Sequence, residues 1–191
     1  MAGERISEIV GAVKTYVYLD QAPVQRINVV AGIDNTLVIL RAKLRSVDVT
    51  RHYASDIPEI EAYGSELNQV WTNLIDNATD AMDGRGAIDI HVRPTDARGV
   101  EVRICDTGPG IPDDVRPRLF EPFFTTKEPG VGTGLGLHIT HAAVARHGGT
   151  IEVEPNPDGG TCFVVTLPGT LQHGPSDGAP SPPEEGAAPQ S

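Results

Sequence analysis

Two asparagines one helical turn apart are the residues whose type and spacing first suggest chemistry. Asn73 and Asn77 lie in SELNQVWTNLIDNATDAM, residues 65–82, whose apolar residues recur with the period of a helix. Asparagine is a poor helix former, so folding alone does not favour the pair. Its amide oxygen is a hard, neutral ligand, suited to Mg²⁺ that phosphates already neutralise. The segment is therefore either a core helix with a solvated face or a helix with a working polar surface.

This predicted helix has two distinct faces. Its apolar side holds Leu67, Val70, Trp71, Leu74, Ala78, Ala81 and Met82. Its polar side holds Gln69, Asn73, Asp76, Asn77 and Asp80. The apolar side predicts packing into the core, which leaves the polar side to face solvent or a ligand.

An aspartate at the end of a predicted strand is the second candidate. The alternating pattern of VEVRICD, residues 100–106, predicts a strand that ends at Asp106. Gly108 and Gly110 surround a proline just beyond it, in a turn whose backbone can approach a ligand closely. A carboxylate at this point could accept a hydrogen bond from the exocyclic amine of adenine, which would exclude guanine. A plain loop with an Asx-turn is the alternative.

A long irregular segment, residues 107–133, follows this strand. It contains Phe120, Phe123 and Phe124, and then Thr125, Thr126 and Lys127. Long irregular loops in compact domains are usually functional or disordered, and aromatic anchors argue against disorder. We therefore predict a lid that the three phenylalanines pin at one end, with threonine and lysine donors for a phosphate. A hydrophobic loop that only packs is the alternative.

The segment GVGTGLGLHIT, residues 130–140, places glycines at alternate positions. A Rossmann turn needs a strand directly before it, and a Walker A loop needs Lys-Ser or Lys-Thr after its last glycine. A protein-kinase glycine loop needs strands on both sides, whereas here a helix is predicted from about 134 to 147. What remains is a glycine loop that leads into a helix N-terminus, which is a favourable anion site.

The other segments complete the predicted fold. Helical periods mark residues 6–17 and 24–45, and strand patterns mark 47–53, 87–94, 150–155 and 161–168. Helices and strands interspersed without strict βαβ order predict an α/β fold, a two-layer sandwich with a mixed sheet and helices on one face. The Pro/Gly/Ser-rich residues 169–191 are expected to be a disordered tail.

Composition narrows the function classes. A net charge of −11 should repel nucleic acid and anionic lipid, so a polyanion such as ATP must be bound by local groups. No apolar run approaches a membrane span, and the N-terminus lacks signal-peptide features, which favours the cytoplasm.

Cys105 and Cys162 lie in apolar stretches without a CxxC pair, so buried thiols are expected rather than a disulfide or metal pair. His138 and His141 form an HxxH pair with no evident third ligand and are expected to be solvated helix residues.

In order along the chain, the motifs closely resemble the N, G1, F and G2 boxes of the sensor histidine kinase catalytic domain. They read NQVWTNLIDNATDAM, DTGPGI, FEPFFTTK and GTGLGL, and GGTCFVVTLP is similar to the closing strand of that family. The resemblance covers residues 45–168. It implies the Bergerat ATP-binding fold of the superfamily that also includes gyrase, the ninety-kilodalton heat-shock chaperone and MutL.

The resemblance implies ATP and Mg²⁺ as ligands and phosphoryl transfer to a histidine as the reaction. Asn77 would coordinate Mg²⁺ between the phosphates, supported by Asn73. Asp106 would bind the adenine amine with Thr161 nearby, and Lys127 would contact the γ-phosphate. The other residues expected around the nucleotide are Asp80, Ala81, Gly108, Gly110, Ile111, Thr125, Thr126, Gly132, Thr133, Gly134, Leu135, Gly136 and Leu137.

Two further comparisons with the family shape the expected activity. In its gyrase-like branch a glutamate that activates water stands where this chain has Asn73, which favours a kinase over an ATP hydrolase. The histidines at positions 52, 91, 138, 141, 147 and 173 are not followed by the Glu or Asp typical of an acceptor site. We therefore expect the chain to bind Mg·ATP without phosphorylating itself.

The N-terminal segment RISEIVGAVKTYVYL resembles the second helix of a dimerisation hairpin without its first. Residues 1–22 are thus expected to be that helix and 23–168 the catalytic domain, in a fragment of a longer protein. The expected partners are an acceptor-histidine dimerisation domain and a response regulator receiver domain. The full-length protein is expected to be a homodimer and this chain a monomer. A serine kinase of the anti-sigma type, a mitochondrial dehydrogenase kinase and a nucleotide-binding pseudokinase are alternatives on the same fold.

Overall fold

The computed structural model describes residues 24–127 and 132–171. The predicted N-terminal helix, and the predicted tail beyond residue 171, lie outside these residues. Within the predicted tail, the Gly169 carbonyl accepts a hydrogen bond from the Glu61 amide at 3.0 Å. No helix in the described ranges combines the length and apolarity that crossing a bilayer requires.

A mixed sheet forms one layer of the fold, in the strand order β2-β4-β5-β7-β6. Its strands are β2 (Val47–Tyr53), β4 (Gly86–Pro94), β5 (Val100–Asp106), β6 (Thr150–Pro155) and β7 (Thr161–Leu167). β2 pairs with β4 in parallel, and the other neighbours pair antiparallel. The predicted strands are confirmed, with bounds that differ by one residue at most.

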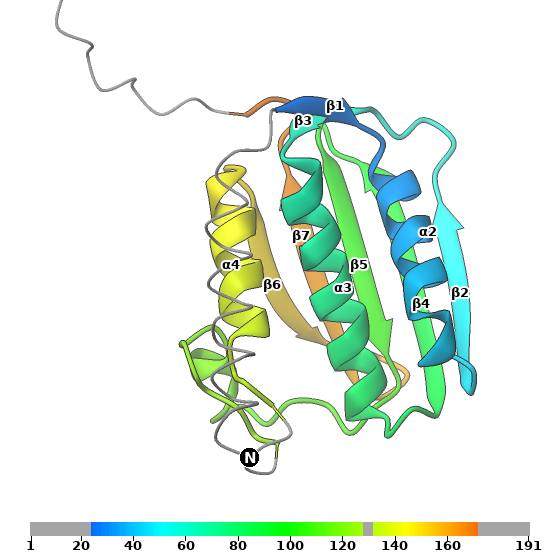
Figure 1. Ribbon diagram of the computed structural model, residues 1–191, viewed down its shortest axis with the longest axis vertical. Helices are drawn as coiled ribbons and strands as arrows, with labels where there is room; N and C mark the ends of the chain where they lie inside the picture. Colours follow the sequence, from blue (N-terminus) through cyan, green and yellow to red (C-terminus); the bar gives the residue numbers. More distant parts are fainter. Residues whose placement is uncertain (1–23, 128–131, 172–191) are drawn as a thin grey trace, which may run out of the picture.

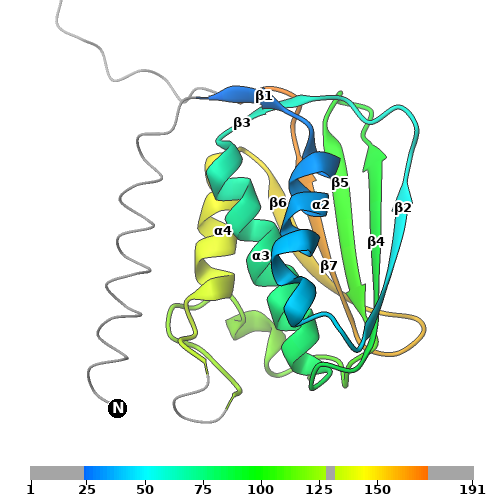
Figure 2. The same ribbon diagram turned by 45° about the vertical axis from the view of Figure 1, so that its right-hand side comes forward.

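Within the described ranges, three helices form the second layer, on one face of the sheet (Figures 1 and 2). They are α2 (Val29–Ile39), α3 (Gly64–Ala81) and α4 (Gly136–Arg146). The short 3-10 helix η2 (Leu40–Ala42) follows α2, and η3 (Arg116–Arg118) lies within the segment 107–133 that was predicted to be irregular. The predicted two-layer α/β sandwich is confirmed.

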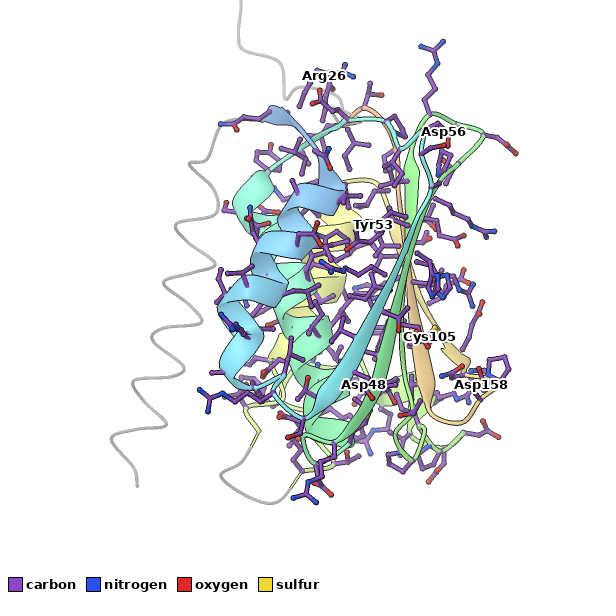
Figure 3. All side chains as sticks on the ribbon, turned by 90° about the vertical axis from the view of Figure 1, so that its right-hand side faces the viewer. Arg26, Asp48, Tyr53, Asp56, Cys105 and Asp158 are labelled. Carbon is purple, nitrogen blue, oxygen red and sulfur yellow. A yellow bond between two sulfur atoms is a disulfide. The ribbon has the colours of Figure 1, made fainter. Side chains whose placement is uncertain are left out.

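The core fills the space between the two layers. Because side chains alternate along a strand, β4 turns Ile88, Ile90 and Val92 toward the helices. Helix α3 buries Leu67, Trp71, Leu74 and their neighbours against them, as its apolar face predicts. Figure 3 shows the side chains packed between the layers, where the Tyr53 hydroxyl of β2 donates to Asp34 of α2 at 3.0 Å.

The helix predicted for residues 24–45 is wrong at both ends. Gln25–Ile27 form strand β1, which pairs antiparallel with β3 (Ile60–Ala62). The Asn28 side chain then accepts from the Ala31 amide at 3.1 Å and caps α2, so the helix cannot begin earlier. The helical period continued beyond α2 because η2 keeps Leu40 and Leu44 packed against the core.

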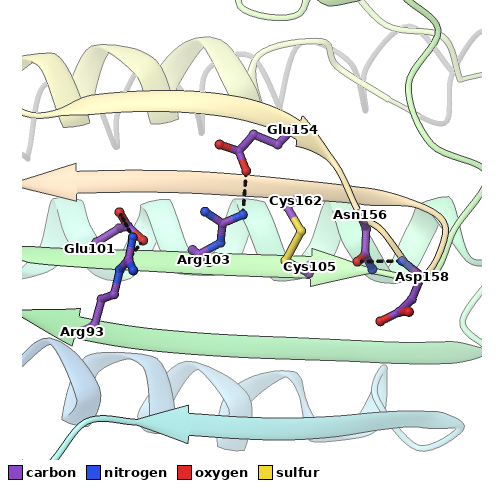
Figure 4. A network of polar contacts seen from close by, with 8 residues as sticks. All are labelled: Arg93, Glu101, Arg103, Cys105, Glu154, Asn156, Asp158 and Cys162. Carbon is purple, nitrogen blue, oxygen red and sulfur yellow. Dashed lines mark hydrogen bonds and ion pairs between the residues drawn. A yellow bond between two sulfur atoms is a disulfide. The ribbon is translucent and has the colours of Figure 1, made fainter.

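The two cysteines form a disulfide, which corrects the expectation of buried thiols. Cys105 of β5 lies directly opposite Cys162 of β7 in the strand register. Figure 4 shows the bond on the sheet face opposite the helices, near the Arg103–Glu154 ion pair of 2.6 Å. Alternation along β5 puts Cys105 on this face, but the pairing of β5 with β7 joins segments 57 residues apart and leaves no local mark in the sequence.

Reduction of this disulfide should lower the free energy of unfolding by about 2–4 kcal/mol, because the bond restricts the unfolded chain over a long loop. Thermal unfolding with and without a reductant measures the effect. The double substitution Cys105→Ser with Cys162→Ser is the control, because reductant should not change its melting temperature. An equal melting temperature for the wild-type chain in both conditions would contradict a stabilising disulfide.

Candidate nucleotide-binding site

A cavity of about 450 Å³ opens where β5 ends, β7 begins and α3 faces the loop before α4. It gathers residues from all four sequence motifs. Its wall includes the predicted residues Asn73, Asn77, Asp80, Ala81, Asp106, Gly110, Ile111, Thr125, Thr126, Lys127, Gly132, Thr133, Gly134, Gly136, Leu137 and Thr161. Gly108 and Leu135 are not part of the wall. The Gly108 amide donates to the Asp106 side chain, and Leu135 occupies the N-cap position of α4 without a side-chain hydrogen bond.

Asp106 is a buried carboxyl group on the wall of this cavity, with 3% of its surface exposed. Its Oδ1 accepts from the Gly108 amide at 2.8 Å and from the Thr161 amide at 3.3 Å. The Gly108 contact is an Asx-turn, so the alternative reading of this segment is also present. The other carboxylate oxygen receives no hydrogen bond from the described residues. It can therefore accept a hydrogen bond from a ligand in the cavity.

The environment of Asp106 sets its acidity. Burial disfavours the charged form and raises the pKa of the carboxyl, and the two backbone amides offset only part of this effect. A carboxylate held in this way gains from a ligand that donates a hydrogen bond to it.

The turn between β6 and β7 supports Asp106, a role that the sequence did not reveal. Asn156 donates from Nδ2 to the Asp106 carbonyl at 2.9 Å. Gly160 has φ +104, and a Cβ there would lie 2.1 Å from the same carbonyl oxygen. Only glycine permits this approach. The segment NPDGG, residues 156–160, joins two predicted strands, but its contact with Asp106 depends on strand pairing.

The two asparagines of α3 occupy different environments. Asn73 accepts from Gln69 at 2.8 Å and donates to the Gly136 carbonyl at 3.0 Å and the Thr140 hydroxyl at 3.2 Å. Asn73 therefore fixes the start of α4 against α3. Asn77 is half-buried on the cavity wall and makes no side-chain hydrogen bond with the described part of the chain. Its amide is available to a cation or a ligand.

Charged groups meet at the Asp80 side of the cavity. Lys127 contacts Asp80 Oδ2 at 2.6 Å, and Lys43, which the sequence analysis did not single out, contacts Asp80 Oδ1 at 2.6 Å. Burial works against ionisation of Asp80, but hydrogen bonds from Lys127 and Lys43 outweigh it and lower the pKa of the carboxyl. Asp80 is thus an ionised bridge between two lysines. Lys43 could be found only from this contact, because it lies far from the motifs in sequence.

The phenylalanines of the lid segment differ from their prediction. The Phe120 ring packs on His141 at 5.1 Å between centroids, and Phe124 lies under the Arg118 guanidinium at 4.5 Å. Phe123 is 64% exposed and does not anchor the lid, because its backbone at φ +66 turns it outward.

His138 Nδ1 lies 3.0 Å from the Phe120 carbonyl. The HxxH pair therefore holds Phe120, rather than being only solvated, and the described residues contain no group of three or more metal-ligating side chains.

Gly134 closes the base of the lid segment. The Phe123 amide donates to the Gly134 carbonyl at 3.0 Å. A Cβ at Gly134 would lie 2.4 Å from the Phe123 carbonyl carbon, and its φ is +67. This position requires glycine for a close backbone contact.

Several apolar wall residues were not predicted as site residues. They are Ala78, Pro109, Pro112, Val115, Leu119, Phe124 and Phe163, and Asp76 adds a missed polar group. The apolar period of α3 and β7 marks Ala78 and Phe163 as core residues, so their second surface, toward the cavity, carries no separate signal.

Comparisons with known proteins agree with this geometry. The family described as histidine kinase-, DNA gyrase B-, and HSP90-like ATPase matches residues 63–171. Sporulation kinase A of Bacillus subtilis (strain 168) is 38% identical over 134 residues, which are 70% of this chain and 22% of that protein. The chain thus spans less than a quarter of that relative's length.

Solved structures give the same result. The catalytic domain of histidine kinase ThkA superposes with a TM-score of 0.71 at 31% identity, over 78% of this chain and 97% of that one. ThkA in complex with the response regulator protein TrrA superposes with a TM-score of 0.71 at 26% identity, over 88% of this chain and 49% of that one. The chain therefore belongs to the histidine kinase-, DNA gyrase B- and HSP90-like ATPase family, and it carries an ATP-binding catalytic domain of the sensor histidine kinase type.

Proposed function

We propose that this cavity binds Mg·ATP and that the domain transfers the γ-phosphoryl group to a histidine of a dimerisation domain. One observation carries the proposal: Asp106 and Asn77, from separate motifs, line the same cavity, and each keeps an oxygen without a hydrogen bond from the described residues. A base and a metal-bound triphosphate need these two kinds of oxygen.

The Asp106 side of the cavity suits adenine. The free carboxylate oxygen can accept from the exocyclic amine, whereas guanine would present a carbonyl oxygen at the equivalent position. Ile111, Ala81 and Phe163 supply apolar surface on the same wall. A buried carboxylate left without a donor loses its compensation for desolvation, so the site should discriminate strongly between the two bases.

The residues around Asn77 suit the phosphates. Asn77 would hold Mg²⁺, since its half-buried amide has no other partner among the described residues and carboxamide oxygens are typical Mg²⁺ ligands. The ion would supply positive charge to the phosphates. Lys127, Thr125 and Thr126 offer donors nearby, and the α4 N-terminus beyond Gly136 adds unpaired backbone amides.

The chemistry of Asn73 favours transfer over hydrolysis. An amide does not accept a proton from water at neutral pH, and the Asn73 amide is already bonded to Gly136 and Thr140. Transfer can then rest on positioning and charge neutralisation, which dominate phosphoryl transfer.

The acceptor belongs to another domain in this proposal. His52, His91, His138, His141 and His147 do not line the cavity. His147 in addition is 2% exposed and accepts from the Tyr63 amide at 3.0 Å, so its role is structural. The partners would be an acceptor-histidine domain in a homodimeric protein and a response regulator, of the kind that ThkA binds in its solved complex. A cytoplasmic site of action, where ATP is available, is part of the same proposal.

Asp106→Asn should weaken ATP binding by at least about tenfold, because the amide nitrogen replaces an acceptor with a donor that opposes the adenine amine. The fold should persist, because the remaining carbonyl oxygen still accepts from Gly108 and Thr161. Isothermal titration calorimetry measures the affinity, and Asp48→Asn on the exposed edge of β2 is the matched control. Equal ATP affinity in wild type and Asp106→Asn would refute the assignment.

The structure also predicts the direction in which Asp106→Asn changes the stability of the fold. The raised pKa of Asp106 contributes stability that is complete below the unfolded-state pKa of about 3.9 and is lost as pH rises through the folded-state pKa. At neutral pH the buried charge opposes folding. Asp106→Asn should therefore melt at the same temperature as the wild type or higher, which separates lost binding from lost fold.

Asn77→Ala should remove the dependence of ATP binding on Mg²⁺. In the wild type we expect ATP to bind about tenfold more tightly with Mg²⁺ than with a chelator, since one ligand to the ion contributes binding energy of this order. In the variant the two affinities should be similar. Asn68→Ala is the control, because Asn68 is exposed on the same helix and is not on the cavity wall. A full Mg²⁺ effect in Asn77→Ala would contradict the metal assignment.

A further inference from the structure

Lys43 joins two carboxylates of the cavity wall from outside the motifs. It follows η2, and its Nζ lies 2.5 Å from Asp76 Oδ1 and 2.6 Å from Asp80 Oδ1. Both aspartates line the cavity, whereas Lys43 does not. One ammonium group thus serves two carboxylates that face the ligand space, one turn of α3 apart.

These carboxylates present a problem for a phosphate ligand. Asn77, the proposed Mg²⁺ ligand, lies between Asp76 and Asp80 in the sequence, so a triphosphate bound there meets two negative side chains. At contact distances the repulsion between like charges is strong when the site is partly shielded from water. A nearby cation must offset it.

Lys127 cannot do this alone. In the structure Lys127 contacts Asp80 at 2.6 Å, and in the proposed function it contacts the γ-phosphate. When Lys127 binds the phosphate, Asp80 keeps only Lys43. Among the described residues, the ion-pair partner of Asp76 is Lys43.

We propose that Lys43 is a positioning residue for the triphosphate: it neutralises Asp76 and Asp80 and so leaves Lys127 free to bind the γ-phosphate. This inference rests on the proposed function of the cavity. It assigns to Lys43 an effect on phosphate-bearing ligands only, because the adenine side of the cavity is formed by Asp106 and its neighbours.

A purely structural ion pair would behave differently. The Lys43 and Asp76 side chains are each 40% exposed, and exposed ion pairs contribute little to the free energy of unfolding. A structural role would change the affinities for ATP and adenosine by similar factors, because it would act through the shape of the cavity. A charge role would change only the affinity for ATP.

The test compares Mg·ATP with adenosine on Lys43→Met. Calorimetry gives the affinity for Mg·ATP, and chemical-shift titration gives that for adenosine. We expect Mg·ATP to bind roughly tenfold more weakly and adenosine to bind as in the wild type. Lys43→Arg, which keeps the charge, should retain most of the ATP affinity.

Two further variants make the result specific. Adding Asp76→Asn and Asp80→Asn to Lys43→Met removes the carboxylates that Lys43 neutralises, so ATP affinity should return toward the wild-type value. Arg51→Met is the matched control, because Arg51 pairs with Asp34 at 3.2 Å with similar exposure but lies away from the cavity wall. It should change neither affinity.

The inference is overturned if Lys43→Met weakens both ligands alike, leaves ATP binding unchanged, or is not rescued by the two Asp→Asn changes. Each of these outcomes leaves the proposed function intact, because the wild-type chain still binds Mg·ATP. A wild-type chain that binds no ATP would instead refute the proposed function itself.

Discussion

Helix α3 can present its asparagines to a ligand only because its opposite face is buried from Leu67 to Ala78. Trp71, Leu74 and Ile75 have no exposed surface, and they lock the rotation of the helix against the sheet. Each residue advances the helix by about 100°, so a rotation by one position would expose an apolar side chain and bury a polar one. The core therefore decides which side of α3 faces the cavity. This packing fixes the positions of Asn73, Asn77 and Asp80.

The end of strand β5 is the second part of the site whose position is fixed by contacts within the fold. Backbone amides of Gly108 and Thr161 hold one oxygen of Asp106, and Asn156 holds its carbonyl from the neighbouring turn. The chain's own side chains and backbone amides therefore position both Asp106 and the polar face of α3.

Local charge reconciles the acidic chain with an anionic ligand. The net charge of −11 disfavours a triphosphate at long range. At the cavity wall, however, Asp80 forms ion pairs with Lys43 and Lys127. The backbone amides of the first turn of α4 add partial positive charge nearby. The electrostatic environment of a bound phosphate is therefore determined by these few neighbouring groups and not by the net charge of the chain.

Much of this could be predicted from the sequence, because the signals were local. The period of α3, the alternation of β5 and the order of the four motifs led to the sandwich and to most of the cavity wall. The features that were missed depend on contacts between distant segments. Strand β1 needs β3, the disulfide needs the register of β5 with β7, and Lys43 needs the approach of η2 to α3. The exposure of Phe123 follows from a positive φ that no propensity predicts for phenylalanine.

The most direct measurement is transfer of label from γ-labelled ATP. The chain is incubated with labelled Mg·ATP, alone and together with a separate dimerisation domain that carries an acceptor histidine, the partner that the proposed function requires. We predict no label on the chain alone and label on the added domain that is lost in acid and retained in alkali, as phosphohistidine is. Acid-stable label, or acid-labile label on the isolated chain, would contradict this account.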